Sequence, residues 1–122
     1  MQENIHHPFR SLFQIDVNRY VEKKGAFSYL SWPFAVAQLR LREGRAQEGI
    51  PFALQALLLN EQTSNTSGVA KCLMVLTQCS RAAGDLESAR AYAERCIAVN
   101  ESMGNAQGVE SARWQLDRLD ER

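Results

Sequence analysis

The sequence predicts an all-α fold, and three observations carry this prediction. Apolar residues recur at i, i+3, i+4 and i+7 along several segments, which is the stripe of an amphipathic helix. Breaks that contain glycine separate these segments. Several residue types recur 40 positions later in the sequence. Gly44 corresponds to Gly84, and Asn60-Glu61 corresponds to Asn100-Glu101. A fixed period of this length is typical of helix pairs that stack on one another.

An N-terminal segment precedes the repeats, and we expect it to hold one capping helix. Its apolar residues within 8–23 fit much of a helix face. The first helix pair is expected over 29–42 and 47–62, separated by Gly44. The predicted organisation is an N-terminal segment, 1–27, and a repeat domain, 28–122, divided into 28–67, 68–107 and a final helix at 108–122.

The second pair shows the strongest pattern. Its first helix is expected over 68–83 and its second over 86–99, with Gly84-Asp85 as the break. The carboxylate of Asp85 can accept a hydrogen bond from the free amides that begin the next helix. One further helix is expected over 106–119, which makes about five to six helices in all. Its apolar stripe is Val109, Ala112, Leu116 and Leu119.

Length and charge bound the function. At 122 residues the chain is long enough for one domain. Fourteen Lys and Arg residues balance fourteen Asp and Glu residues, so the formal net charge is zero. The zero is a cancellation, because residues 1–45 carry a net +3 and residues 46–122 a net −3. A protein whose whole surface is basic is excluded, but local basic patches are not.

Several classes of protein find no support in the sequence. No apolar run is long enough to span a membrane, and the start lacks the pattern of a signal peptide. The three cysteines (Cys72, Cys79 and Cys96) have no close spacing, which suits reduced thiols in the cytoplasm. The only histidines, His6 and His7, are adjacent and have no nearby ligand cluster. We therefore expect no catalytic residues, no metal, no other cofactor and no enzymatic activity.

The repeat resembles the tetratricopeptide (TPR) family over about residues 28–122. The residues that carry the resemblance are Gly44, Gly49, Phe52, Ala53 and Ala56 in one repeat, and Gly84, Ala89, Tyr92, Ala93 and Cys96 in the other. The small residues allow close approach of paired helices, and the aromatic residues fill the space between layers. The resemblance implies a short right-handed solenoid of helix pairs.

The N-terminal segment resembles a different family. Glu22-Lys23-Lys24 is followed closely by Tyr29-Leu30-Ser31-Trp32, and this order is similar to the start of Sak-type phage single-strand annealing proteins. The resemblance covers about residues 8–37. We expect no counterpart of the rest of such a protein in residues 45–122. Two interpretations stay open, a recombined or truncated annealing protein and a solenoid that has reused this segment as its cap.

The TPR resemblance implies a candidate binding groove, because the first helix of each pair lines the concave surface in such solenoids. Its floor would be apolar, its rim cationic, and acids almost absent. The candidate groove residues are Phe34, Gln38, Arg42, Lys71, Met74, Gln78, Arg81, Trp114 and Arg118. Such a groove suits an acidic peptide or a C-terminal carboxylate held by Arg forks. Whether it is open or filled by the N-terminal segment stays undecided.

The basic N-terminal segment carries an alternative site. Arg19, Lys23 and Lys24 could contact phosphates, while Tyr29 or Trp32 stacks on bases. The competing interpretation is a solvated basic turn beside core aromatic residues.

The first hypothesis for function is therefore a cytoplasmic protein-interaction adaptor that binds an acidic peptide or protein through the groove. The alternative is a single-stranded DNA-binding and annealing protein that uses the N-terminal segment. We also expect self-association through the helix at 106–119, because Leu116 and Leu119 would otherwise expose apolar surface.

Overall fold

The computed structural model describes residues 32–120, which form helices joined by tight turns. The helices are α2 (Trp32–Arg42), α3 (Ala46–Gln62), α4 (Thr66–Ala82), α5 (Leu86–Ser102) and α6 (Ala106–Leu119). The predicted all-α fold is confirmed for this part of the chain. Each helix lies within a few residues of its predicted range, whereas the predicted capping helix and the domain boundary at residue 28 lie outside the described residues.

The turns between helices contain the glycines that interrupt the helical pattern of the sequence. Gly44, Gly84 and Gly104 have φ values of 77°, 88° and 70°, which glycine adopts at little cost. In the turn before α4 the positive φ, 56°, belongs to Ser64.

Asn65, Asp85 and Asn105 cap α4, α5 and α6 by accepting a hydrogen bond from a backbone amide three residues later, whereas Arg45 before α3 makes no such bond. These 3.1 Å bonds run from Gly68 N to Asn65, from Ser88 N to Asp85 and from Gly108 N to Asn105.

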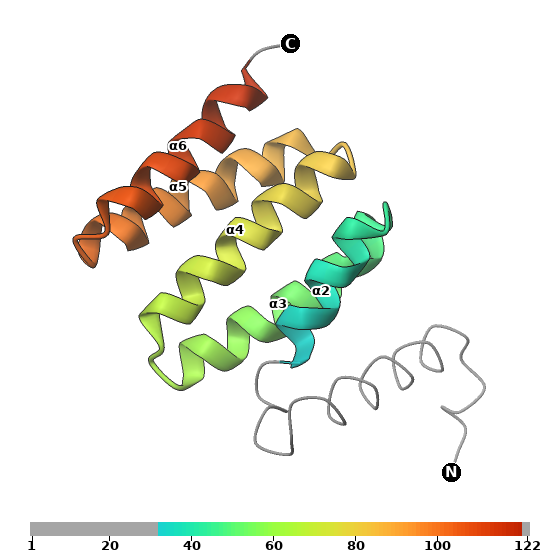
Figure 1. Ribbon diagram of the computed structural model, residues 1–122, viewed down its shortest axis with the longest axis horizontal. Coiled ribbons are helices and arrows are strands. Elements are labelled where there is room, and N and C mark those ends of the chain that lie inside the picture. Colours follow the sequence, from blue (N-terminus) through green and yellow to red (C-terminus); the bar gives the residue numbers. More distant parts are fainter. Residues whose placement is uncertain (1–31, 121–122) are drawn as a thin grey trace.

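The central helix of the described part is α4. Each helix packs against the next one in sequence, and α4 also contacts both α2 and α6 (Figure 1). Leu73, Leu76 and Cys79 of α4 are completely buried. They share one apolar core with Phe52 of α3 and Ala112 of α6. The helices thus form two layers, with α2, α4 and α6 in one and α3 and α5 in the other.

Two expectations about the fold need comment. The leucines of α6 were expected to expose apolar surface, but Leu119 is only 4% exposed and Leu116 is half-buried. The expectation is wrong for Leu119, because it packs inward. No helix in residues 32–120 is long and apolar enough to cross a membrane. The right-handed course of a solenoid stays a prediction.

Candidate functional site

The cations of the described part fall into two groups. Five arginines are paired with carboxylates. Arg40 lies 3.1 Å from Glu43, and Arg45 lies 2.6 Å from Glu48. The remaining pairs are Arg90 with Asp120, Arg95 with Glu61, and Arg113 with Glu101. In these five the positive charge is already matched, so they have little capacity left for an external anion.

The second group consists of Arg42, Lys71, Arg81 and Arg118, which have no carboxylate partner within residues 32–120. All four lie on α2, α4 or α6, and neither α2 nor α4 contains an acidic residue. We call the surface formed by α2, α4 and α6 the cationic face. Its unmatched charge is available to an anionic ligand.

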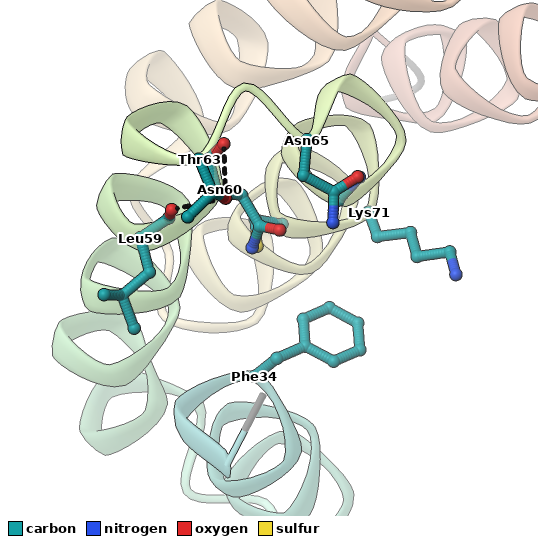
Figure 2. A pocket seen from close by; sticks show the side chains of 8 residues that line it. Phe34, Leu59, Asn60, Thr63, Asn65 and Lys71 are labelled. Carbon is teal, nitrogen blue, oxygen red and sulfur yellow. Dashed lines mark hydrogen bonds between the residues drawn. The ribbon is translucent and has the colours of Figure 1, made fainter. Parts of the chain in front are cut away.

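A first hollow opens on the cationic face between α2 and the turn that joins α3 to α4. It has a volume of about 330 Å³ and is lined by Phe34, Leu59, Asn60, Thr63, Asn65, Gly68, Lys71 and Cys72. Figure 2 shows the Phe34 ring on one side of the hollow and the Asn60 and Asn65 amides on the other, with Lys71 beside them. The hollow thus combines an aromatic wall, amide groups and one cation.

Two further hollows continue the row. One of about 170 Å³ shares Lys71 with the first and is also lined by Met74 and Asn100. One of about 440 Å³ shares Met74 with its neighbour and reaches Trp114 on α6. Since each hollow shares a lining residue with the next, the three follow one path across α2, α4 and α6, with Lys71 and Met74 between them. The path also meets one acid, because Glu110 lines the third hollow.

An exposed aromatic residue stands at the α6 end of this path. Trp114 is 55% exposed, the largest exposed fraction among the large apolar side chains described. The Arg118 guanidinium lies 4.6 Å from the centre of the Trp114 ring, a cation–π contact. Arg81 donates a 3.3 Å hydrogen bond to Gln115, which orients its guanidinium between α4 and α6. The α6 end therefore joins a flat aromatic surface to two positive charges.

The thiols are not reactive groups of this site. Burial raises the pKa of Cys72 to about 11 and also raises the pKa of Cys79 and Cys96. All three side chains are therefore protonated near neutral pH, as befits small core residues. In residues 32–120 no group of three or more His, Cys, Asp or Glu side chains is placed to hold a metal ion.

The predicted groove residues all lie on α2, α4 or α6, the helices that form the cationic face. Phe34, Gln38, Met74, Gln78 and Arg81 are half-buried there. The exposed members are Arg42, Lys71, Trp114 and Arg118. In place of one groove, the face carries the row of smaller hollows.

The alternative site is largely outside the described residues. Arg19, Lys23, Lys24 and Tyr29 all precede residue 32. Trp32 is described, and it is half-buried and packed against the core.

Asn60 and Asn65 were missed as candidate site residues. The sequence marks both, because they return at Asn100 and Asn105 with the same spacing. That repeat indicated only a turn, whereas the structure places the first pair in the wall of a hollow.

Comparison with known protein families matches residues 7–80 to the model of the Sak single strand annealing protein family. The matched segment runs through α2 and α3 and ends near the end of α4. No curated protein and no solved structure matches the chain.

This finding corrects two expectations. The hypothesis of a TPR-type adaptor for an acidic peptide is wrong, because the matched family is one of strand-annealing proteins and no TPR match accompanies it. The physical reason is that unmatched cations above apolar hollows suit phosphates as well as carboxylates, so the pattern did not identify the anion. The expectation that residues 45–122 hold no counterpart of the rest of a Sak-type protein is wrong for residues 45–80, which the match includes.

The match covers well over half of the chain, including the whole segment whose Glu22-Lys23-Lys24 and Tyr29-Leu30-Ser31-Trp32 resembled that family. The chain belongs to the Sak single strand annealing protein family.

Proposed function

We propose that this protein binds single-stranded DNA and promotes the pairing of complementary strands, and that the cationic face contacts the DNA. Family membership supports the activity. One observation carries the choice of surface: the four cations without a carboxylate partner in residues 32–120 all lie on α2, α4 and α6.

Unmatched cations favour a polyphosphate chain for a physical reason. A side chain that neutralises a phosphate releases a condensed counterion, and this release drives association at low salt. An arginine already paired with a carboxylate gains much less, because it must give up its partner. Arg42, Lys71, Arg81 and Arg118 therefore supply most of the attraction available in residues 32–120, although the chain is neutral overall.

The row of hollows supports an extended ligand. It leads from Phe34 on α2 past Met74 on α4 to Trp114 on α6. Exposed aromatic rings provide stacking surfaces for bases without regard to sequence. Phosphate contacts along such a path leave most base edges free, and annealing requires free edges on both strands.

The N-terminal segment extends this proposal. Arg19, Lys23 and Lys24 would add phosphate contacts, and Tyr29 would add a stacking surface. This remains a proposal because all four residues lie outside the described part. Self-association through α6, a cytoplasmic location and the absence of enzymatic activity stay predictions as well, the first of which light scattering on the full chain would check.

The test is binding and annealing by the full chain. Fluorescence anisotropy with a labelled 30-nucleotide strand should show binding that weakens steeply with salt. For each phosphate contact, the logarithm of the association constant should fall by about 0.7 when the salt concentration rises tenfold. Mixing two complementary strands that carry a fluorophore and a quencher should show faster pairing when the protein is present. Absence of binding at 50 mM salt would refute the proposal, and binding without faster pairing would refute its annealing part.

A further inference from the structure

Two hollows of the cationic face are built on the same repeated frame. In the first, Asn60 at the end of α3, Asn65 at the cap of α4 and Gly68 line the wall. In the second, 40 residues later, Asn100, Asn105 and Gly108 do so. In each frame the glycine leaves room for the amides, because a Cβ atom at this position would collide with both asparagine side chains. The two frames differ in what their amides do.

The second frame is internally satisfied. Asn105 Nδ2 donates a 3.1 Å hydrogen bond to Asn100 Oδ1, and Asn100 Nδ2 donates a 2.9 Å bond to the Cys96 carbonyl. Asn100 is only 3% exposed. Flexible Met74 and Met103 line this hollow, which measures about 170 Å³. This frame is a closed structural joint between α5 and α6.

The first frame is open. Asn60 Nδ2 donates to the Ala56 carbonyl at 2.8 Å, and Asn65 Oδ1 accepts from Gly68 N at 3.1 Å. These bonds fix which end of each amide is oxygen and which is nitrogen. Within residues 32–120, Asn60 Oδ1 and Asn65 Nδ2 make no hydrogen bond with each other or with another group, although they lie against Gly68 nearly as Asn100 Oδ1 and Asn105 Nδ2 lie against Gly108. One acceptor and one donor are left over beside a hollow of about 330 Å³.

The residues around the open frame also differ from those of the closed one. Phe34 stands where the second frame has Met74, so a flat ring replaces a flexible thioether. Lys71 lies between the two hollows and lines both, and it has no carboxylate partner in the described part. Figure 2 shows the Phe34 ring and the two amides on opposite sides of the hollow.

From this difference we infer that the first hollow is a subsite for one unpaired nucleobase. The base packs against Phe34, its edge donates to Asn60 Oδ1 and accepts from Asn65 Nδ2, and Lys71 contacts the adjoining phosphate. Every nucleobase carries a donor beside an acceptor on its pairing edge, so the subsite accepts more than one base. The inference rests on the proposed function, since it names the part of the strand that this hollow takes.

The test compares two 15-nucleotide strands, one of thymidines and one in which every base is replaced by an abasic unit. The full wild-type chain should bind the thymidine strand at least about tenfold more tightly at equal salt. Phe34→Leu should weaken thymidine binding by about tenfold and leave abasic binding unchanged. Trp114 stacks bases elsewhere on the face, so the loss caused by Phe34→Leu is the decisive reading.

Asn65 allows a matched pair of variants. Asn65→Ser keeps the helix cap, because serine caps as well as asparagine, but it removes the Nδ2 donor. It should weaken thymidine binding several-fold, while Asp85→Ser, the same kind of cap replacement at α5 outside the row of hollows, should not. Circular dichroism of every variant checks that the helices are intact.

The outcomes separate the two proposals. Equal wild-type affinity for both strands, or equal losses on both strands in Phe34→Leu, would overturn the base subsite while strand binding stands. Failure of the wild-type chain to bind either strand would overturn the proposed function itself.

Discussion

The two helix layers have opposite electrostatic character. The layer of α2, α4 and α6 holds all four cations that lack a carboxylate partner in the described part. The layer of α3 and α5 is acidic: α3 carries two glutamates and no cation, and the arginines of α5 are paired. One layer can attract a phosphate chain and the other repels it.

The difference teaches that net charge is a poor guide for a protein built in layers. A formal charge of zero would argue against nucleic-acid binding if the charges were mixed evenly. Here the helices of one layer carry a net +4 and those of the other a net −3. The local balance of charges on each layer, and the pairing of each cation, decide which surface can hold an anion.

Neutralising the cationic face tests this comparison most severely. Replacing Arg42, Lys71, Arg81 and Arg118 together by glutamine should weaken binding of single-stranded DNA by roughly 100-fold or more in 100 mM salt. The slope of the logarithm of the association constant against the logarithm of the salt concentration should become shallower by about 3, since each lost phosphate contact removes about 0.7. Anisotropy over a salt series measures both quantities.

The matched control lies on the other layer. Arg90→Gln combined with Arg95→Gln removes two exposed arginines of α5 that are paired with Asp120 and Glu61. Binding should change by less than about twofold, because these charges are already matched. A large loss in this control, with little loss in the fourfold variant, would reverse the assignment of the layers.

The exposed apolar side chains of the two layers offer a smaller contrast. Trp114→Leu should weaken binding of single-stranded DNA by about tenfold, since it removes a stacking surface on the cationic face. Leu58 on α3 is 54% exposed, close to the 55% of Trp114. Leu58→Ala should leave affinity unchanged in the same anisotropy assay. Equal effects of the two variants would show that exposed apolar surface, rather than the face that bears it, governs binding.

The smallest effect concerns acid stability of the acidic layer. Hydrogen bonds from Ser88 hold the pKa of Asp85 below its ordinary value. A carboxyl group whose pKa is lowered in the folded state stabilises the protein above its unfolded pKa, and this stabilisation is lost as pH falls below about 4. Asp85→Asn keeps a capping side chain that does not titrate.

Thermal melting should therefore show little change at pH 7 and a smaller loss of melting temperature between pH 5 and 3 than in the wild type. An unaltered pH profile would mean that the cap contributes nothing to acid sensitivity.

Much of the fold followed from local sequence signals. Gly84 and Asp85 predicted a helix break and a helix cap. The turn requires a residue with positive φ and a side chain that accepts a hydrogen bond from a backbone amide, and both requirements are local. The pairing of charges could not be predicted in this way. Arg95 meets Glu61 across 34 residues of chain, and this contact depends on how α3 and α5 each pack against α4.

The choice of the face that holds Lys71, Arg81 and Trp114 came from the TPR resemblance and stays a prediction, whereas the adaptor function inferred with it was wrong. The open amide pair of Asn60 and Asn65 could not be told from its closed copy, because the same residues at the same spacing form both. Only side-chain geometry separates them.

The burial of α4 has a consequence for any attempt to divide the protein. The family match ends at residue 80, yet Leu73 and Leu76 of α4 share their core with Cys96 of α5 and Ala112 of α6. A fragment cut at that residue would expose to water the side of α4 that α5 and α6 cover. Unfolding of the helices from α2 to α6 should thus be a single transition. The segment that matches the family depends for its stability on two helices that lie outside the match.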